Sequence, residues 1–82
     1  MRGRSPWKVG QLVSPAGLSL PLWINRQGDY YESDMTGRLD EGKVGLVVET
    51  YVLGDMGEPD WVRVVGDGGV GWNRPWNFQV IG

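Results

Sequence analysis

Glycine and proline interrupt this chain so often that long helices are excluded, and this constrains the fold more than any other feature. The 82 residues include 14 glycines and 5 prolines. No stretch repeats apolar residues at the i, i+3, i+4, i+7 spacing of an amphipathic helix. The length predicts one small domain. We therefore expect a single all-β domain built from short strands.

The clearest strand pattern is the run K-V-G-L-V-V-E-T-Y-V, residues 43–52. Side chains alternate along a strand, which divides this run into two faces. One face is expected to hold Val44, Leu46 and Val48, and the other Gly45, Val47 and Glu49. Further strands are expected at residues 8–13, 60–65, 70–72 and 78–81, with one 3₁₀ turn at 75–77. About five short strands at this spacing are typical of a small, bent antiparallel barrel.

The segment Gly66-Asp-Gly-Gly69 predicts a tight hairpin turn, because glycine and aspartate accept the backbone angles that such turns need. With Gly71 it also matches the G-x-G-x-x-G spacing of dinucleotide-binding loops. That motif requires a following helix to hold the pyrophosphate, and here a strand follows. The hairpin is therefore the better interpretation.

A long segment, residues 14–41, joins the first two expected strands. Unstructured loops of more than about 12–15 residues are uncommon in compact domains. The apolar run at 18–24 and the pair Tyr30-Tyr31 argue against disorder here. We expect this elaborated loop to fold back as an extra hairpin or to rest on a neighbouring molecule.

Several kinds of chemistry have no residues to support them. The chain has no histidine and no cysteine, so the commonest general base and the commonest transition-metal ligands are missing. The carboxylates of residues 55–60 lack the spacing of a calcium loop. No apolar run approaches the ~20 residues of a membrane span, and no signal peptide is expected at the N-terminus. We expect a non-enzymatic protein with no metal, no cofactor, no membrane partner and no small-molecule substrate.

Charge is distributed unevenly along the chain. Residues 1–8 form a basic N-terminal arm with Arg2, Arg4 and Lys8, ahead of a domain at 9–82. Residues 29–60 hold nine acidic side chains against two basic ones. The arm is expected to dock on an acidic neighbour or between two copies of the chain, or else to be a flexible tail that aids solubility. The acidic body argues against nucleic acid as a partner.

Five tryptophans in so short a chain are unusual. Trp72, like Phe78, lies on an expected core strand. The other four are harder to bury together in one small barrel, and tryptophan is enriched at the centres of protein interfaces. We expect at least two of these four to contact another chain: Trp7, Trp23, Trp61 and Trp76.

The order of expected elements resembles an SH3-like barrel: strand, long loop, strand, hairpin, 3₁₀ turn, strand. The run Gly42-Lys-Val-Gly-Leu-Val-Val-Glu49 resembles the first strand of KOW-type barrels. The run Gly71-Trp-Asn-Arg-Pro-Trp-Asn-Phe-Gln-Val80 is similar to the end of signalling SH3 domains. Residues 42–81 as a whole look most like the short SH3-like proteins of tailed bacteriophages.

This resemblance implies a virion structural protein, such as a capsid cement or a neck or tail accessory protein, made in the cytoplasm of a bacterial host. Its partners would be other virion proteins or further copies of itself. The residues expected to form the protein interface are Arg2, Arg4, Trp7, Leu20, Leu22, Trp23, Tyr30, Tyr31, Trp61 and Trp76.

The alternative is a regulatory SH3/KOW-like module that binds nucleic acid or a host protein. A peptide groove of the SH3 type would use Tyr30, Tyr31, Trp61, Pro75 and Phe78 to grip a proline-rich segment. The Ala-Leu-Tyr-Asp-Tyr signature of those domains is absent from the chain.

Overall fold

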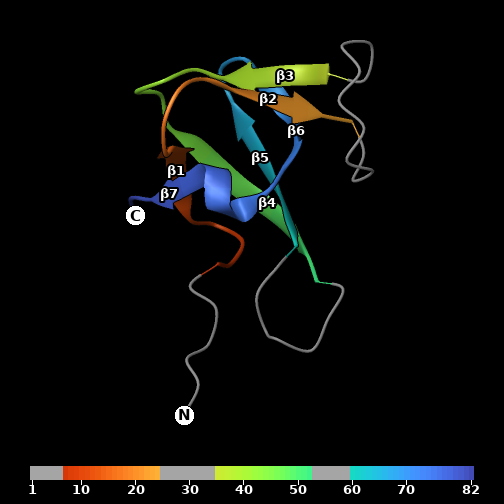
Figure 1. The fold of residues 1–82 in the computed structure, drawn as a ribbon. Helices are drawn as coiled ribbons and strands as arrows, with labels where there is room; N and C mark the ends of the chain where they lie inside the picture. Colours follow the sequence, from red (N-terminus) through yellow and green to blue (C-terminus); the bar gives the residue numbers. More distant parts are fainter. Residues whose placement is uncertain (1–6, 25–34, 53–59) are drawn as a thin grey trace.

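The structure, a computed structural model, describes residues 7–24, 35–52 and 60–82 (Figure 1). These residues form seven β-strands and one 3₁₀ turn, and they contain no α-helix. The elements are β1 (Leu12–Pro15), β2 (Leu20–Trp23), β3 (Met35–Leu39), β4 (Gly45–Tyr51), β5 (Trp61–Gly66), β6 (Gly69–Asn73), η2 (Pro75–Asn77) and β7 (Phe78–Val80). The all-β prediction is confirmed, and so is the 3₁₀ turn.

All seven strands belong to one sheet in the order β3-β2-β6-β5-β4-β1-β7, and every neighbouring pair is antiparallel. The predicted hairpin between β5 and β6 is confirmed, with Gly66 paired to Gly69 across the turn. The number of strands was predicted as about five, which is two fewer than the described residues form. The extra two are β2 and β3, and both come from the long segment at 14–41.

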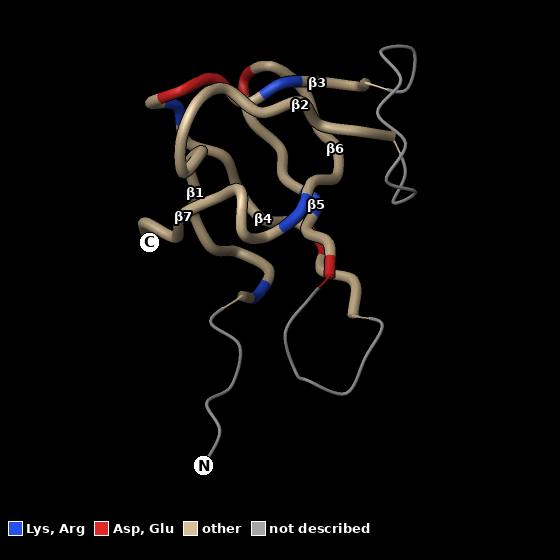
Figure 2. The backbone as a smooth tube through the Cα atoms, viewed as in Figure 1, with Lys and Arg blue, Asp and Glu red and all other residues tan. Residues whose placement is uncertain are grey.

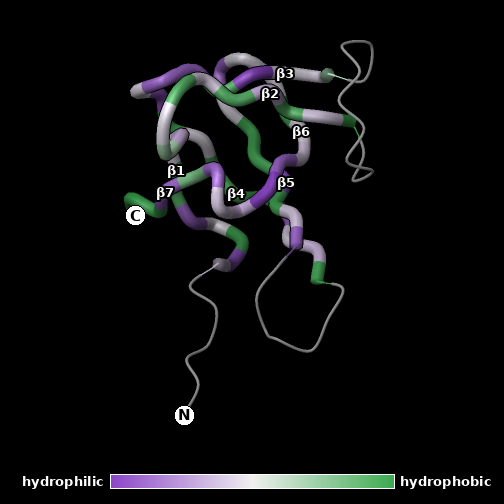
Figure 3. Tube along the Cα trace, in the orientation of Figure 1, coloured by the Kyte–Doolittle hydropathy of each residue, from purple (hydrophilic) through white to green (hydrophobic). Residues whose placement is uncertain are grey.

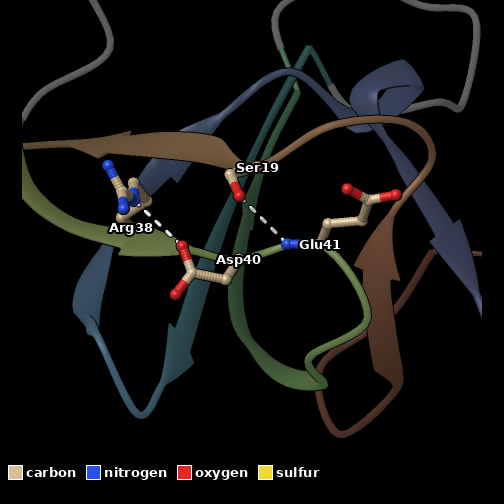
Figure 4. Close-up of polar contacts among 4 residues, drawn as sticks. All are labelled: Ser19, Arg38, Asp40 and Glu41. Carbon is tan, nitrogen blue, oxygen red and sulfur yellow. Dashed lines mark hydrogen bonds and ion pairs between the residues drawn. The ribbon is translucent and has the colours of Figure 1, made fainter.

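The β2–β3 pair confirms that this segment folds back as a hairpin. Leu20 pairs with Leu39 and Leu22 pairs with Gly37, and β2 then continues the sheet onto β6. Beyond β3 the chain is tied to the residue before β2, because the backbone N–H of Glu41 donates to Ser19 Oγ at 3.1 Å (Figure 4). The tip of the hairpin, residues 25–34, lies outside the described residues.

The first strand begins later than predicted. Residues 8–13 were expected to be extended, but a turn occupies 8–11, where Gly10 has a φ of +99° and the N–H of Lys8 donates to Gln11 Oε1 at 2.7 Å. Strand β1 then runs on to Pro15, which pairs with Phe78. A proline is tolerated at the end of a strand because its missing N–H costs no ladder bond there.

The hydrophobic core lies on one face of the sheet and receives side chains from six of its strands. Trp7 and Leu20 are half-buried against it. The buried core residues are Val13, Leu22, Leu39, Val47, Val62, Val64 and Phe78.

Gly71 allows β6 to lie against β2. A Cβ atom at Gly71 would stand 2.7 Å from the carbonyl carbon of Leu22 and 2.7 Å from Thr36 Oγ1. Both distances are below any normal carbon contact, so only glycine fits. Glycine at this position therefore serves a close approach of two strands.

A β-bulge in β4 changes which face its side chains occupy. Val47 pairs with Val64, but the next pair along is Glu49 with Arg63, so Val48 is an extra residue on β4. An extra residue reverses the alternation of side chains beyond it. The prediction that Glu49 shares a face with Val47 is therefore wrong. Val47 is fully buried, whereas Glu49 is exposed and its Oε1 atom lies 3.4 Å from Arg63 Nη1.

Candidate protein interface

An unbroken row of apolar side chains crosses the face of the sheet opposite the core. Leu12 on β1 is the cross-strand partner of Leu46 on β4, Leu46 that of Val65 on β5, and Val65 that of Val70 on β6. Their sequence neighbours Val13, Val47 and Val64 point into the core, so Leu12, Leu46 and Val65 point away from it, and Val70 does so as the cross-strand partner of Val65. We call this row, Leu12, Leu46, Val65 and Val70, the outer apolar row.

The β1 and β4 end of the outer apolar row is the more exposed end. Leu12 is 42% exposed and Leu46 38% exposed, while Val65 and Val70 are half-buried. Beside Leu12 lies the exposed Ile81, whose backbone N–H donates to the carbonyl of Leu12 at 2.8 Å. Figure 3 shows this C-terminal end of the chain as a hydrophobic segment next to β1 and β7.

The outer apolar row shares its face with one ion pair, Glu49 on β4 and Arg63 on β5, whereas its other two strands carry no charge. Strands β1, β2, β6 and β7 contain no aspartate, glutamate, lysine or arginine, as the tan tube in Figure 2 shows. A sheet face that meets water normally alternates apolar core positions with polar outer ones. An apolar row that crosses four strands of the outer face departs from this rule, and exposed apolar patches often mark sites of protein contact.

Three of the residues predicted to form the interface are buried inside the chain. Leu22 belongs to the core, and the exposed fractions of Trp23 and Trp61 are 6% and 3%. The idea that the indoles exceed what one chain can bury is therefore wrong for Trp23 and Trp61. Arg2, Arg4, Tyr30 and Tyr31 fall outside the described residues.

Trp23, Trp61 and Trp72 are buried outside the core cluster. Trp23 on β2 is the cross-strand partner of Trp72 on β6, and Trp72 is in turn the partner of Arg63 on β5. The β2–β3 hairpin therefore supplies cover that a five-stranded sheet would lack. Trp61 is covered by Arg74, whose Cζ atom lies 3.9 Å from the centre of the Trp61 ring.

The remaining predicted interface residues in the described ranges differ in exposure. Trp7 and Leu20 are half-buried against the core, and the Trp7 ring meets the edge of Phe78 at a centroid distance of 6.4 Å. Trp76 on η2 is 68% exposed. Trp76 is thus the one predicted tryptophan in the described residues that offers most of its ring to a partner.

The groove predicted for the alternative function has no open aromatic surface in the described part of the chain. Trp61, Pro75 and Phe78 are all buried, and Trp61 lies under a guanidinium group. A proline-rich peptide binds by packing on exposed aromatic rings.

Sequence reasoning missed the outer apolar row and Arg74. A signal for the row was present, because the run at 43–52 places valine or leucine on both of its faces. A strand with one face in water needs only one apolar face, so apolar residues on both faces indicate that the second is also covered. Arg74 had no comparable signal, since its role depends on its position over Trp61.

In the described ranges no three acidic, histidine or cysteine side chains converge as a metal site would require. A membrane-crossing helix is likewise not found in the part of the chain that the structure describes. Comparison of the chain with protein-family models, with curated proteins and with solved structures gives no match.

Proposed function

We propose that the chain is a non-enzymatic subunit of a larger protein assembly and that it acts by adhesion through the face opposite its core. The observation that carries the proposal is the outer apolar row, above all the paired and exposed leucines Leu12 and Leu46. Fully burying a leucine or valine side chain stabilises a complex by about 1.5–3 kcal/mol. Covering the remaining exposed surface of these two leucines is therefore worth roughly 1 kcal/mol each.

The shape of the contact favours a protein partner. A row that crosses four strands offers an extended surface, in contrast to the concave sites that bind small molecules. The absence of charged residues from β1 and β6 means that little desolvation of charge opposes contact there.

We assign the fold to the SH3-like barrels, and the assembly to a tailed-bacteriophage virion. Support for the barrel comes from the order of elements, in which β1 pairs with both β4 and β7 and η2 precedes the last strand. Support for the virion comes from the resemblance of residues 42–81 to short phage proteins. In this proposal the chain is made in the bacterial cytoplasm and ends in the particle as a cement, neck or tail accessory subunit.

The test compares two substitutions of the same chemistry at two exposed leucines. Leu46→Glu places a charge in the outer apolar row, and Leu18→Glu places one on an exposed leucine that is not part of it. Each variant is expressed in infected cells, and gradient-purified particles are quantified by mass spectrometry. The wild type and Leu18→Glu should be found in particles, and Leu46→Glu should be depleted by about tenfold or more, the equivalent of 1.4 kcal/mol.

Two results would contradict the proposal. One is absence of the wild-type chain from purified particles, and the other is equal incorporation of both variants. Size-exclusion chromatography with light scattering on the isolated chain then shows whether a second copy is the neighbour. The regulatory alternative predicts a gel shift with nucleic acid that is strong at low salt and lost at high salt.

A further inference from the structure

At the corner of the molecule formed by η2, the positive charge of Arg74 has no acidic partner among the described residues. The Cζ atom of Arg74 lies 3.9 Å from the ring centre of Trp61 and 5.4 Å from that of Trp76. A guanidinium over an indole face is attracted by the ring electrons, more strongly where water is partly excluded. The Arg74 side chain is thus held between a buried tryptophan and an exposed one.

Hydrogen bonds fix this corner to the sheet. The buried Asn73 accepts from the backbone N–H of Arg74 at 2.6 Å and from Asn77 Nδ2 at 2.8 Å through the same Oδ1 atom. Its Nδ2 atom donates to the carbonyl of Pro21 at 2.7 Å. The turn that carries Trp76 is therefore tied to β2. The guanidinium end of the Arg74 side chain is fixed as well, because its Nη1 atom donates to the backbone carbonyl of Asp60 at 3.2 Å.

Arg74 differs from the other two arginines in the described ranges. Arg38 Nε donates to Asp40 Oδ1 at 2.9 Å (Figure 4), and Arg63 pairs with Glu49. In the same ranges Arg74 has no carboxylate within ion-pair distance, and it meets only a backbone carbonyl and two rings. A guanidinium has five N–H donors in a planar fork, and that fork matches a carboxylate.

We propose that Arg74 and Trp76 form a recognition site for a carboxylate of a partner protein, with the exposed Trp76 ring packing on an apolar group beside that carboxylate. Tryptophan and arginine are the residues that most often dominate the energy of protein interfaces. The inference rests on the adhesive function proposed above, but it concerns different residues from those of the outer apolar row.

The charges favour a protein over a nucleic acid as the source of the anion. Nucleic-acid binding sums several phosphate contacts, each made by a free cation. The chain has a formal net charge of −2, and Arg38 and Arg63 are already paired with acids. Within residues 7–24, 35–52 and 60–82, the one arginine without an acidic partner lies beside an exposed indole, which suits a single carboxylate next to an apolar side chain.

The site is tested by titrating the full-length, ¹⁵N-labelled chain with two blocked peptides, Glu-Leu-Glu-Leu-Glu and its neutral match Gln-Leu-Gln-Leu-Gln. The readouts are the NMR signals of the Arg74 Nε–H and the Trp76 indole N–H. We expect both signals to move with the acidic peptide, and the neutral peptide to bind at least about fivefold more weakly, since charge-assisted hydrogen bonds are the stronger ones.

Substitutions at Arg74 and Trp76 test whether these two side chains bind the acidic peptide. Arg74→Gln should weaken binding of the acidic peptide by about tenfold, and Arg74→Lys should restore only part of it, because lysine keeps the charge but not the planar fork. Trp76→Ala should also weaken binding. Its ring is largely exposed, so this variant tests the site even if loss of Arg74 disturbs the packing on Trp61. Leu18→Glu is the control that should bind as the wild type does.

Three outcomes would overturn the inference: equal binding of the two peptides, unchanged binding by both Arg74→Gln and Trp76→Ala, or tighter binding of a twelve-residue oligothymidylate than of the acidic peptide at the same salt concentration. The last result would assign the corner to nucleic acid. Peptide binding and particle incorporation use different variants and probes, so either proposal can fail while the other stands.

Discussion

Val47 and Glu49, two residues apart on β4, lie on opposite faces of the sheet because Val48 forms a bulge between them. In a regular strand they would share a face. The bulge keeps a carboxylate out of the core and places it beside Arg63, on the outer face.

This arrangement predicts very different costs for two alanine substitutions on β4. Val47→Ala removes fully buried methyl groups and should lower the free energy of unfolding by about 2 kcal/mol. Glu49→Ala removes only an exposed ion pair and should cost less than about 1 kcal/mol. Urea unfolding followed by tryptophan fluorescence measures both, and equal costs would place Glu49 in the core.

Alanine substitutions at Leu22 and Leu18 should distinguish a core leucine from a surface one by their effects on stability. Leu22→Ala leaves a cavity among fully buried neighbours, and we expect a loss of about 2–5 kcal/mol. Leu18 is 78% exposed, so Leu18→Ala should change stability by no more than about 0.5 kcal/mol. A Leu22→Ala protein as stable as the wild type would return Leu22 to the list of surface candidates.

The close approach of β6 to β2 predicts that Gly71 cannot be replaced. Gly71→Ala would force its new methyl group against the backbone of Leu22 and should cost about 1–3 kcal/mol or more. Gly17 has no atom within 4 Å of a Cβ position and no positive φ, so Gly17→Ala is the matched control and should be neutral or slightly stabilising. Thermal unfolding by circular dichroism decides between them. Similar melting temperatures would show that the two strands are farther apart.

The bonds of Asn73 predict that it holds η2 against β2. Asn73→Ala leaves the carbonyl of Pro21 and the Nδ2 atom of Asn77 without this partner and should cost about 2–3 kcal/mol. Gln79→Ala removes one hydrogen bond, to Ser14 Oγ at 3.2 Å, from an exposed side chain and should cost under about 1 kcal/mol. Hydrogen exchange at the amide of Asn77, which donates to the carbonyl of Arg74, should accelerate in Asn73→Ala only.

Local patterns in the sequence predicted the parts of the fold that depend on neighbours in the chain. The hairpin at Gly66–Gly69 follows from residues that accept turn geometry, and η2 follows from a proline after a strand. The bulge at Val48 could not be predicted in this way. An apolar run such as L-V-V is compatible with a regular strand and with a bulged one. Only the pairing with β5 determines where the bulge lies.

The same distinction, between features set by neighbours in the chain and features set by strand pairing, decided which residues of the candidate site could be predicted. Trp76 was expected in a turn after proline, and it is exposed. The burial of Trp23 depends on its pairing with Trp72, far along the chain, and that of Trp61 depends on the Arg74 side chain. Contacts of this kind are set by strand order, which the sequence pattern does not contain.

The most direct test of the adhesive face uses the fact that the chain has no cysteine, so a single introduced thiol is unique. Leu46→Cys and, as control, Leu18→Cys are treated with a maleimide, both as isolated chains and within purified particles. We predict that the thiol at position 46 reacts in the isolated chain and reacts about tenfold or more slowly in the particle. A tenfold protection corresponds to a contact free energy of about 1.4 kcal/mol. The thiol at position 18 should react alike in both. Equal reactivity at position 46 in the two states would contradict the account.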